Sequence, residues 1–364
     1  MKKWFCFYAI LVMVSCTHKK NEISYEYMSL DTMRYINETA LSKKISKSEW
    51  QKFNSCNRSI INFCIEDSLL IAYTQRSEAL FDIYNINDQT YRNSFFHKGN
   101  GEYELVMGAN ITQTTTFYSE SDSLYTDIYD IAKGRVLSIN ITKFLSTKIP
   151  EYIIRFEHQE LPKTSTFWAK RLGNSTYITR SIAEKETKQV RKIWSKDTIG
   201  DYAYLDILNR FQIPEGEGFN IMSSLVAVTN DGKRIVEAPL GLNYINAYSI
   251  FEKFGYSLCI DKTPYKLSNI LETSRHNRKY VFADVRAYEN GYAVLVYDID
   301  ESTYQKDEYY SPFMLFMNWD GEVKLKIYSD FKFNHFDIDV QKKRIYVLDE
   351  LGEIYYCDIK TMLL

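Results

Sequence analysis

Residues 80–86 (LFDIYNI) recur 45 positions later as residues 125–131 (YTDIYDI), and residues 354–359 (IYYCDI) give a weaker copy near the C-terminus. Other apolar, strand-like runs fall at Thr176–Ile182, 225–229 and Phe313–Asn318. Most steps between these runs are 40–50 residues long, which is typical of one four-stranded blade of a β-propeller. The repeat therefore predicts an all-β propeller over roughly residues 60–360.

The number of blades depends on the stretch from Leu225 to Phe313, which is about twice as long as the other steps. It holds either one blade with an insertion or two blades. We expect six blades of four antiparallel strands, and the pattern also admits seven. Turn signals at Asn230-Asp231-Gly232, Asn290-Gly291 and Asp320-Gly321 separate apolar runs and predict hairpins whose residues accept positive φ. A sandwich or a barrel would also have short strands, but neither explains the 45-residue self-similarity.

The composition agrees with a strand-rich fold and excludes two classes of protein. Of the 364 residues, 30 are Tyr, 21 are Phe and 5 are Trp, and bulky aromatic side chains suit strands that are buried on both faces. The 45 Lys and Arg nearly balance the 47 Asp and Glu, so the net charge is −2. This balance argues against a nucleic-acid-binding protein, which has a basic excess. The average charged and apolar fractions argue against wholesale disorder.

The N-terminus predicts a lipid anchor. Lys2 and Lys3 precede an apolar stretch, residues 4–14, which is too short to span a bilayer but has the length of a signal-peptide core. The sequence MVSC that ends at Cys16 resembles the lipobox of bacterial lipoproteins, with Met13 where Leu is usual. We therefore expect residues 1–15 to be a signal peptide, Cys16 to be acylated (palmitate among its acyl chains), and residues 16–24 to be a tether. The single propeller domain then covers residues 25–364. The mature chain, residues 16–364, has a net charge of −4, because two lysines leave with the signal.

The remaining cysteines predict no redox or zinc site, since the sequence holds no CxxC pair. Cys64, Cys259 and Cys357 each lie in an apolar run and are expected to be buried free thiols. A bridge between Cys56 and Cys64 is the alternative that the spacing allows in an exported protein.

The C-terminal third resembles a family of Gram-negative bacterial lipoproteins, the TolB-like six-bladed propellers. The residues that carry this resemblance are 294–297 (VLVY), 316–323 (FMNWDGEV), 336–339 (FDID) and 344–347 (RIYV). Upstream, residues 97–103 (HKGNGEY) are similar to the family's GxGPxE-aromatic connection after the first blade, without its Pro. The resemblance implies a six-bladed fold and a lipid anchor. It supplies no catalytic residues to carry over.

Two groups of residues are candidates for a binding site. His97, Gly99, Gly101 and Glu102 belong to a Gly-rich segment that lacks the GK[ST] of a phosphate loop. We read this segment as a tight crossover between blades, and the alternative is a binding site at the mouth of the central channel. Carboxylates from different blades are the other candidates, because converging carboxylates bind Ca²⁺ in calcium-dependent propeller hydrolases. These carboxylates are Asp298, Asp300, Asp337 and Asp339.

The sequence holds five His, no HExxH and no GxSxG elbow, and therefore names no catalytic residue. We predict a lipid-anchored cell-envelope propeller that acts as a non-enzymatic binding module for a protein, peptide or glycan partner. No cofactor and no nucleic-acid partner are expected. The absence of an acidic run after Cys16 favours an outer-membrane anchor that faces the periplasm. The alternative is a calcium-dependent propeller hydrolase or lactonase whose site lies in the central channel.

Overall fold

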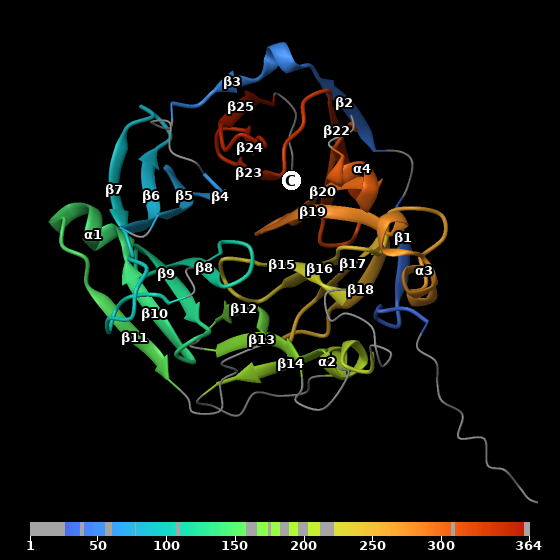
Figure 1. Cartoon of the computed structure of the whole chain (residues 1–364), viewed down its shortest axis with the longest axis horizontal. Coiled ribbons are helices and arrows are strands. Elements are labelled where there is room, and N and C mark those ends of the chain that lie inside the picture. The colour runs from blue at the N-terminus through green and yellow to red at the C-terminus, as the bar shows by residue number, and fades with distance from the viewer. Residues whose placement is uncertain are drawn as a thin grey trace, which may run out of the picture.

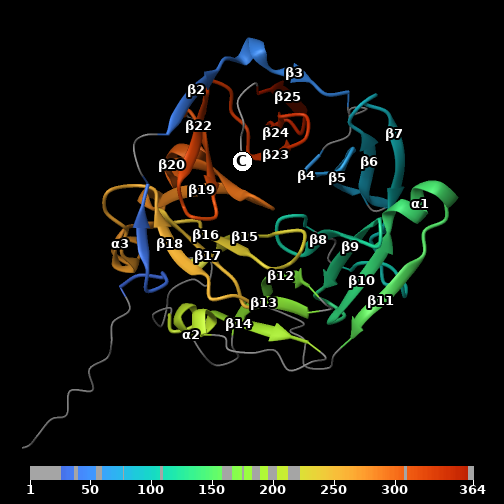
Figure 2. The ribbon, with the colours of Figure 1, turned by 180° about the vertical axis from the view of Figure 1, so that it is seen from behind.

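A computed structural model shows six β-sheets arranged as blades around one axis, so the chain is a six-bladed β-propeller (Figures 1 and 2). The structure describes residues 26–36, 40–54, 60–76, 78–106, 110–157, 166–173, 176–182, 189–195, 203–211, 222–306 and 310–359. The predicted acylation site, Cys16, the signal peptide, the tether and Cys56 lie outside the described residues. The blade number agrees with the prediction of six, and the seven-bladed alternative is wrong.

Blades 1 to 3 follow one another along the chain, each starting with its innermost strand. Blade 1 consists of β4 (Asn62–Glu66), β5 (Leu69–Arg76), β6 (Ala79–Asn85) and β7 (Tyr91–Phe95). Blade 2 consists of β8 (Thr115–Glu120), β9 (Ser123–Asp130), β10 (Arg135–Asn140) and β11 (Tyr152–Glu157). Within the described residues, blade 3 has three strands, β12 (Thr166–Leu172), β13 (Thr176–Ile182) and β14 (Gln189–Trp194).

Blades 4 to 6 complete the ring. Blade 4 consists of β15 (Ser224–Val228), β16 (Ile235–Pro239), β17 (Tyr244–Tyr248) and β18 (Gly255–Cys259). Blade 5 consists of β19 (Lys279–Tyr288), β20 (Gly291–Asp300), β21 (Phe313–Asn318) and β22 (Val323–Ser329). Blade 6 takes β23 (His335–Asp339), β24 (Arg344–Leu348) and β25 (Ile354–Asp358) from the C-terminal end of the chain.

The N-terminal segment supplies the outermost strand of the last three blades. β1 (Met33–Tyr35) pairs in parallel with β18, and β2 (Leu41–Ile45) pairs in parallel with β22. β3 (Gln51–Lys52) pairs antiparallel with β25 and gives blade 6 its fourth strand. Because β3 precedes blade 1 in the sequence, it joins the beginning of the chain to its end and closes the ring (Figure 1).

Within the described residues, four short α-helices lie in connections within or between blades. They are α1 (Ile141–Thr147), α2 (Ala203–Leu208), α3 (Leu267–Glu272) and α4 (Glu301–Gln305). α1 begins at Asn140, whose side chain accepts a hydrogen bond of 2.8 Å from the Lys143 backbone N–H, as an N-cap residue does. Among the described residues, no helix is long and apolar enough to cross a membrane.

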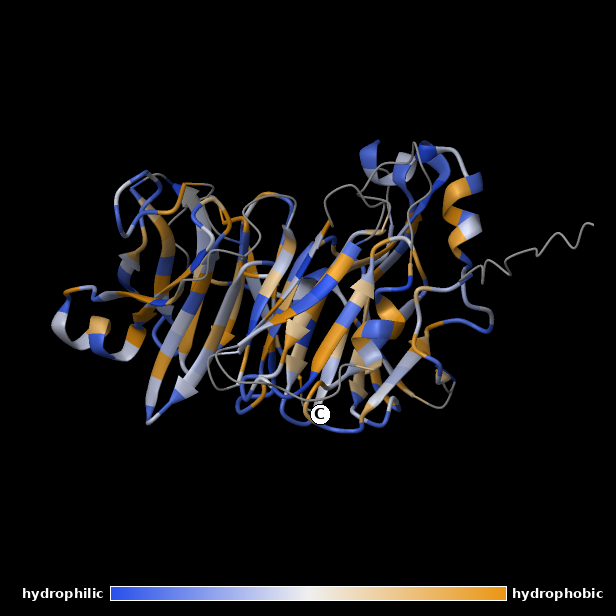
Figure 3. Cartoon of the chain, turned by 90° about the horizontal axis from the view of Figure 1, so that it is seen from below, coloured by the Kyte–Doolittle hydropathy of each residue, from blue (hydrophilic) through white to orange (hydrophobic). Residues whose placement is uncertain are grey.

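The apolar core is divided among the interfaces between neighbouring blades. Phe53, Phe63 and Tyr346 are fully buried between blades 6 and 1, and comparable clusters fill the other five interfaces. Apolar residues consequently recur along the strands across the whole width of the molecule (Figure 3). The aromatic excess of the sequence fills these interfaces, where each sheet is covered on both faces.

The 45-residue repeat does not match equivalent strands, although it indicated the correct fold. Residues 80–86 include most of β6, the third strand of blade 1, whereas residues 125–131 lie mainly in β9, the second strand of blade 2. The six innermost strands begin at residues 62, 115, 166, 224, 279 and 335, so the true step is 51–58 residues. Both copies share a pattern of apolar residues alternating around a buried aspartate, which different strands of a propeller can adopt.

The predicted hairpins are confirmed between β15 and β16, between β19 and β20 and between β21 and β22. Gly232 and Gly321 have φ values of 73° and 80°, which is the left-handed region that glycine tolerates. A Cβ at Gly232 would lie 2.1 Å from the backbone nitrogen of Gly173 in blade 3, so this turn also needs glycine for a close approach. Asn290 and Gly291 do not adopt positive φ, so the positive φ expected in that turn is wrong.

A buried ion-pair network joins blades 3 and 4. Glu237 on β16 accepts hydrogen bonds of 2.7 and 2.8 Å from Arg191 on β14 and one of 3.2 Å from Arg180 on β13. Ser224 and Tyr248 donate to the same carboxylate at 2.9 and 3.2 Å. Burial alone would raise the pKa of Glu237, but the charges of Arg191 and Arg180 lower it below its usual value.

Candidate functional site

The innermost strands surround an axial cavity of about 720 Å³, a volume typical of small-ligand pockets. Every blade contributes to its wall. Representative lining residues, one from each blade in order, are Cys64, Thr116, Lys170, Val226, Arg286 and Asp337. The axial position follows from the fold, since the first strand of each blade lies nearest the axis (Figure 1).

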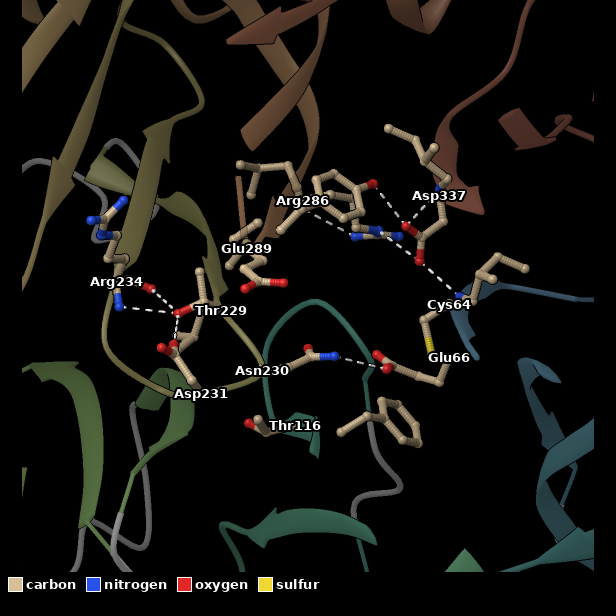
Figure 4. A pocket seen from close by; sticks show the side chains of 18 of the residues that line it. Cys64, Glu66, Thr116, Thr229, Asn230, Asp231, Arg234, Arg286, Glu289 and Asp337 are labelled. Carbon is tan, nitrogen blue, oxygen red and sulfur yellow. Dashed lines mark hydrogen bonds and ion pairs between the residues drawn. The ribbon is translucent and has the colours of Figure 1, made fainter. Parts of the chain in front are cut away.

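The turns between the first and second strands of several blades also line the cavity. These turns all lie on one face of the propeller. Asp67, Asn230, Glu289 and Gln341 lie in these turns, in blades 1, 4, 5 and 6. In Figure 4, Asn230 and Glu66 point toward each other from opposite sides of the cavity, and Glu289 extends into the space above them. The Asn230 Nδ2 atom donates a hydrogen bond of 3.1 Å to Glu66, linking blades 1 and 4 across the cavity.

One wall of the cavity carries a buried charge network shared by blades 5, 6 and 1. Arg286 donates hydrogen bonds of 2.8 Å to Asp284 and 3.1 Å to the Phe63 carbonyl, and its Nε lies 3.6 Å from Asp337. Asp284 also accepts from the Phe336 backbone N–H at 3.1 Å and lies 3.2 Å from the His335 ring. Although burial opposes ionisation, Arg286 and His335 lower the pKa of Asp284. These bonds hold the innermost strands of three blades in register.

Asp337 and Glu66 are carboxyl groups whose pKa values are both raised. Asp337 accepts hydrogen bonds of 2.8 Å from Tyr288, Ile65 and its neighbour Ile338, yet burial raises its pKa. Burial, followed by the nearby charge of Asp337, raises the pKa of Glu66 to about 8. At neutral pH the cavity therefore presents Glu66 chiefly as a neutral carboxylic acid, which both donates and accepts hydrogen bonds.

Blade 3 contributes Lys170 to the cavity wall. The side chain is 6% exposed and reaches into blade 2, where its Nζ donates hydrogen bonds of 2.8 Å to the Ile111 carbonyl and 2.6 Å to the Thr115 carbonyl. Burial, followed by the charge of Arg286, lowers the pKa of Lys170 to about 7. The motif search of the sequence did not single out Lys170, Arg286 or Glu66. The available signal was a charged residue inside an apolar run, as in TFWAKRL (Thr166–Leu172).

The sequence-predicted site residues fall into two places. Asp337 and Asp339 line the cavity and are buried, not solvated. Asp298 and Asp300 lie at the end of β20, away from the cavity-lining residues, where Lys279 approaches them at 4.0 and 3.4 Å.

The Gly-rich segment with His97, Gly99, Gly101 and Glu102 forms the connection from β7, the outermost strand of blade 1, to blade 2. It does not contribute to the lining of the axial cavity. The segment contacts the neighbouring part of blade 2. Lys133 donates a hydrogen bond of 2.6 Å to the Gly101 carbonyl, and Arg135 at the start of β10 donates to the carbonyl of Glu102. The crossover interpretation matches this position.

A calcium site built from acidic side chains would need several of the described residues to meet at one point. Within them, no three His, Cys, Asp or Glu side chains come together in a group able to hold a metal ion. The oxygens of Asp337 already accept from Tyr288 and two backbone N–H groups, and the side chain of Arg286 lies beside it. Cys64, Cys259 and Cys357 are buried free thiols, as expected.

Comparison with known proteins supports the fold. The sequence matches no protein-family model and no curated protein. Among solved structures, a member of the DUF4221 family from Bacteroides vulgatus superposes with a TM-score of 0.51 at 12% identity, covering 84% of this chain and 94% of that one. The calcium-binding protein regucalcin from Agrobacterium tumefaciens gives a TM-score of 0.44 at 7% identity, covering 91% and 96%. At 12% identity the likeness to the DUF4221 member supports the propeller fold and says nothing about ligand or activity.

Proposed function

We propose that this chain is a lipid-anchored propeller of the cell envelope that binds a peptide, glycan or other small polar ligand in its axial cavity, without catalysing a reaction. The observation that carries the proposal is the cavity itself, because all six blades line it and the turns at one face surround it. Propeller turns vary in sequence without disturbing the strands that hold them. A rigid ring with a polar axial cavity therefore suits selective binding.

The interior of the cavity suits a ligand that forms many hydrogen bonds. It offers the amide of Asn230, the carboxyl of Glu66 and the hydroxyl of Thr116 beside apolar side chains such as Val226 and Phe117. Small-ligand sites typically combine an apolar wall with a few placed polar groups. A sugar ring or an amino-acid side chain has this mixture of polar edges and apolar faces.

The anchor rests on the sequence. Lys2, Lys3, the apolar residues 4–14 and Cys16 form the lipoprotein signal, and the resemblance to TolB-like lipoprotein propellers supports the same assignment. The described body begins at Glu26, which forms an ion pair of 2.9 Å with Lys266 beside α3. Ten residues of extended chain span at most about 35 Å. The tether would therefore keep the propeller close to the membrane, which we propose to be the outer membrane on its periplasmic side.

The calcium-dependent hydrolase is the rival function. It requires several oxygen ligands at one axial point, and of the four candidate carboxylates only Asp337 and Asp339 line the cavity. Since the described residues form no metal-binding group, we retain the non-enzymatic binding module.

The binding proposal is tested by native mass spectrometry of the mature protein released from its own membrane without denaturation. We expect a bound mass in the wild type that is lost in Glu289→Trp, because Glu289 is exposed and points into the cavity (Figure 4). Glu350→Trp is the matched control, since Glu350 is exposed in the turn between β24 and β25, on the opposite face. An identical spectrum for all three proteins would contradict the proposal.

The anchor has a separate test. We expect the wild-type chain to incorporate labelled palmitate and to sediment with membranes, and Cys16→Ala to do neither. Labelling that persists in Cys16→Ala would contradict acylation at this residue, and it would leave the result on the cavity unaffected.

A further inference from the structure

Lys170 is a buried amine that no carboxylate neutralises. Among the described residues, its Nζ has two hydrogen-bond partners, the carbonyls of Ile111 and Thr115, and it forms no ion pair. A buried ammonium ion is costly unless an opposite charge or several acceptors compensate it. Arg286 repels a cation at this position, and the opposing influences of Cys64 and Asp284 on the Lys170 pKa are weaker.

The number of hydrogen-bond acceptors around the Lys170 Nζ equals the number of N–H bonds of a neutral amine. A neutral amine carries two N–H bonds and one lone pair, whereas an ammonium ion carries three N–H bonds. Two carbonyls satisfy the two N–H bonds of the neutral form. An ammonium ion would keep a third N–H without a protein partner in the described part of the chain. Lys170 is also one of the residues that line the axial cavity.

We propose that Lys170 is a reactive amine site, at which the neutral amine condenses with a small aldehyde or ketone that enters the axial cavity. The lone pair of Nζ attacks the carbonyl carbon, an N–C bond forms, and the carbonyl oxygen leaves as water with the two hydrogens of the nitrogen. A proton from solvent then gives the imine one N–H, which donates to the carbonyl of Ile111 or Thr115. No oxidant or reductant takes part in this step.

The surroundings of Lys170 support this chemistry. Neutral lysines activated by burial or by a neighbouring cation are the type that forms Schiff bases with carbonyl compounds, and Lys170 has both features. A cavity of about 720 Å³ holds a ligand much larger than water, whose share of liquid volume is about 30 Å³. Reducing sugars and keto acids belong to the chemical class that fits both the amine and the polar wall. The reactivity is a property of Lys170 and does not depend on the binding function proposed above.

Competitive labelling tests the proposal on the intact wild-type protein. The mature chain is treated at pH 7 with limiting propanal and sodium cyanoborohydride, which reduces and traps the imine, and the modified lysines are identified by peptide mapping. An ordinary lysine with a pKa near 10.4 is neutral in roughly one molecule in 10³ at this pH. We expect Lys170 to be labelled at least tenfold faster than the exposed Lys253, with a rate that rises with pH to a plateau above about 7.

Two variants separate reactivity from structure. Glu289→Trp, which narrows the cavity entrance, is expected to slow labelling of Lys170 and to leave Lys253 unchanged. Lys170→Arg keeps a donor for both carbonyls and is expected to remove only the labelled peptide that contains position 170. Labelling of Lys170 no faster than Lys253, or a rate still rising steeply at pH 9 as for an exposed lysine, would overturn the proposal.

Discussion

Replacing Glu237 with glutamine removes the negative charge that two buried guanidinium groups share between blades 3 and 4. Glu237 and Arg180 are fully buried, and Arg191 is 3% exposed, so solvent cannot replace the lost charge. The glutamine side chain would keep one acceptor oxygen, while its amide N–H groups would face the donors of the arginines. Removing one partner of a buried pair costs about 3–5 kcal/mol, and we expect a loss near the middle of that range.

The pKa of Arg180 supports the direction of this effect. Burial, followed by the charge of Arg191, lowers the pKa of Arg180 to about 9 even with Glu237 present. Without the carboxylate the two guanidinium groups repel each other with no intervening anion. Adding Arg180→Met to Glu237→Gln should therefore recover part of the stability, and the two changes should be non-additive by more than about 1 kcal/mol.

Urea denaturation followed by tryptophan fluorescence measures the effect, because Trp168 donates a hydrogen bond of 3.4 Å to Ser224 within the same network. The control is Glu151→Gln, which breaks the exposed Lys143–Glu151 pair of 2.7 Å and should cost less than about 1 kcal/mol. If Glu237→Gln destabilised the protein no more than Glu151→Gln does, the network would not hold the two blades together.

Two further predictions address the cavity and the closure of the ring. The folded protein retains the Glu66 proton up to about pH 8, whereas an unfolded Glu loses it near 4.5, so this group makes stability fall as pH rises through that window. In urea titrations, the stability of Glu66→Gln relative to wild type should therefore increase as the pH rises from about 5 to about 9. The exposed Glu289→Gln should show no such gain. Equal pH profiles for Glu66→Gln and wild type would refute the raised pKa of Glu66. Phe53 follows β3 and packs against Tyr84 and Tyr346 at 6.1 and 6.2 Å between ring centroids, so Phe53→Ala should cost about 3–5 kcal/mol. The exposed Ile61→Ala should leave the denaturation midpoint nearly unchanged, and a similar small effect of Phe53→Ala would show that closure contributes little.

The sequence predicted the strands with strong local signals and missed those that depend on an available edge. Apolar strands joined by a Gly-containing turn, such as β15 and β16 around Gly232, can be recognised as a hairpin from their own residues. β2 (LSKKI) and β3 (QK) are short and polar, so nothing in their composition indicates a strand. They form because the outer edges of β22 and β25 have unpaired backbone groups that these segments satisfy.

Sequence patterns named some of the residues that line the cavity and missed others, because contacts between blades leave no local signal. The acidic pair in FDID marked β23, and both Asp337 and Asp339 line the cavity. The sequence grouped Asp298 and Asp300 with them as carboxylates from different blades, but Asp298 and Asp300 end the second strand of blade 5 rather than the first. Only the innermost strand of a blade reaches the axis. The roles of Lys170 and Arg286 depend on contacts across blades that no local pattern encodes.

Everything proposed for the cavity requires one closed ring of six blades, and a cross-link between β3 and β25 tests that most directly. Gln51 and Tyr356 are paired across these antiparallel strands, where Cα atoms lie about 4.5–5.5 Å apart, within the range of a disulfide. In a Cys357→Ala background, Gln51→Cys with Tyr356→Cys should oxidise to a species that migrates faster on a non-reducing gel. Gln51→Cys with Asp358→Cys, two residues out of register, should not. No cross-link in the first pair, or equal cross-linking in both, would contradict a ring closed by the N-terminal strand.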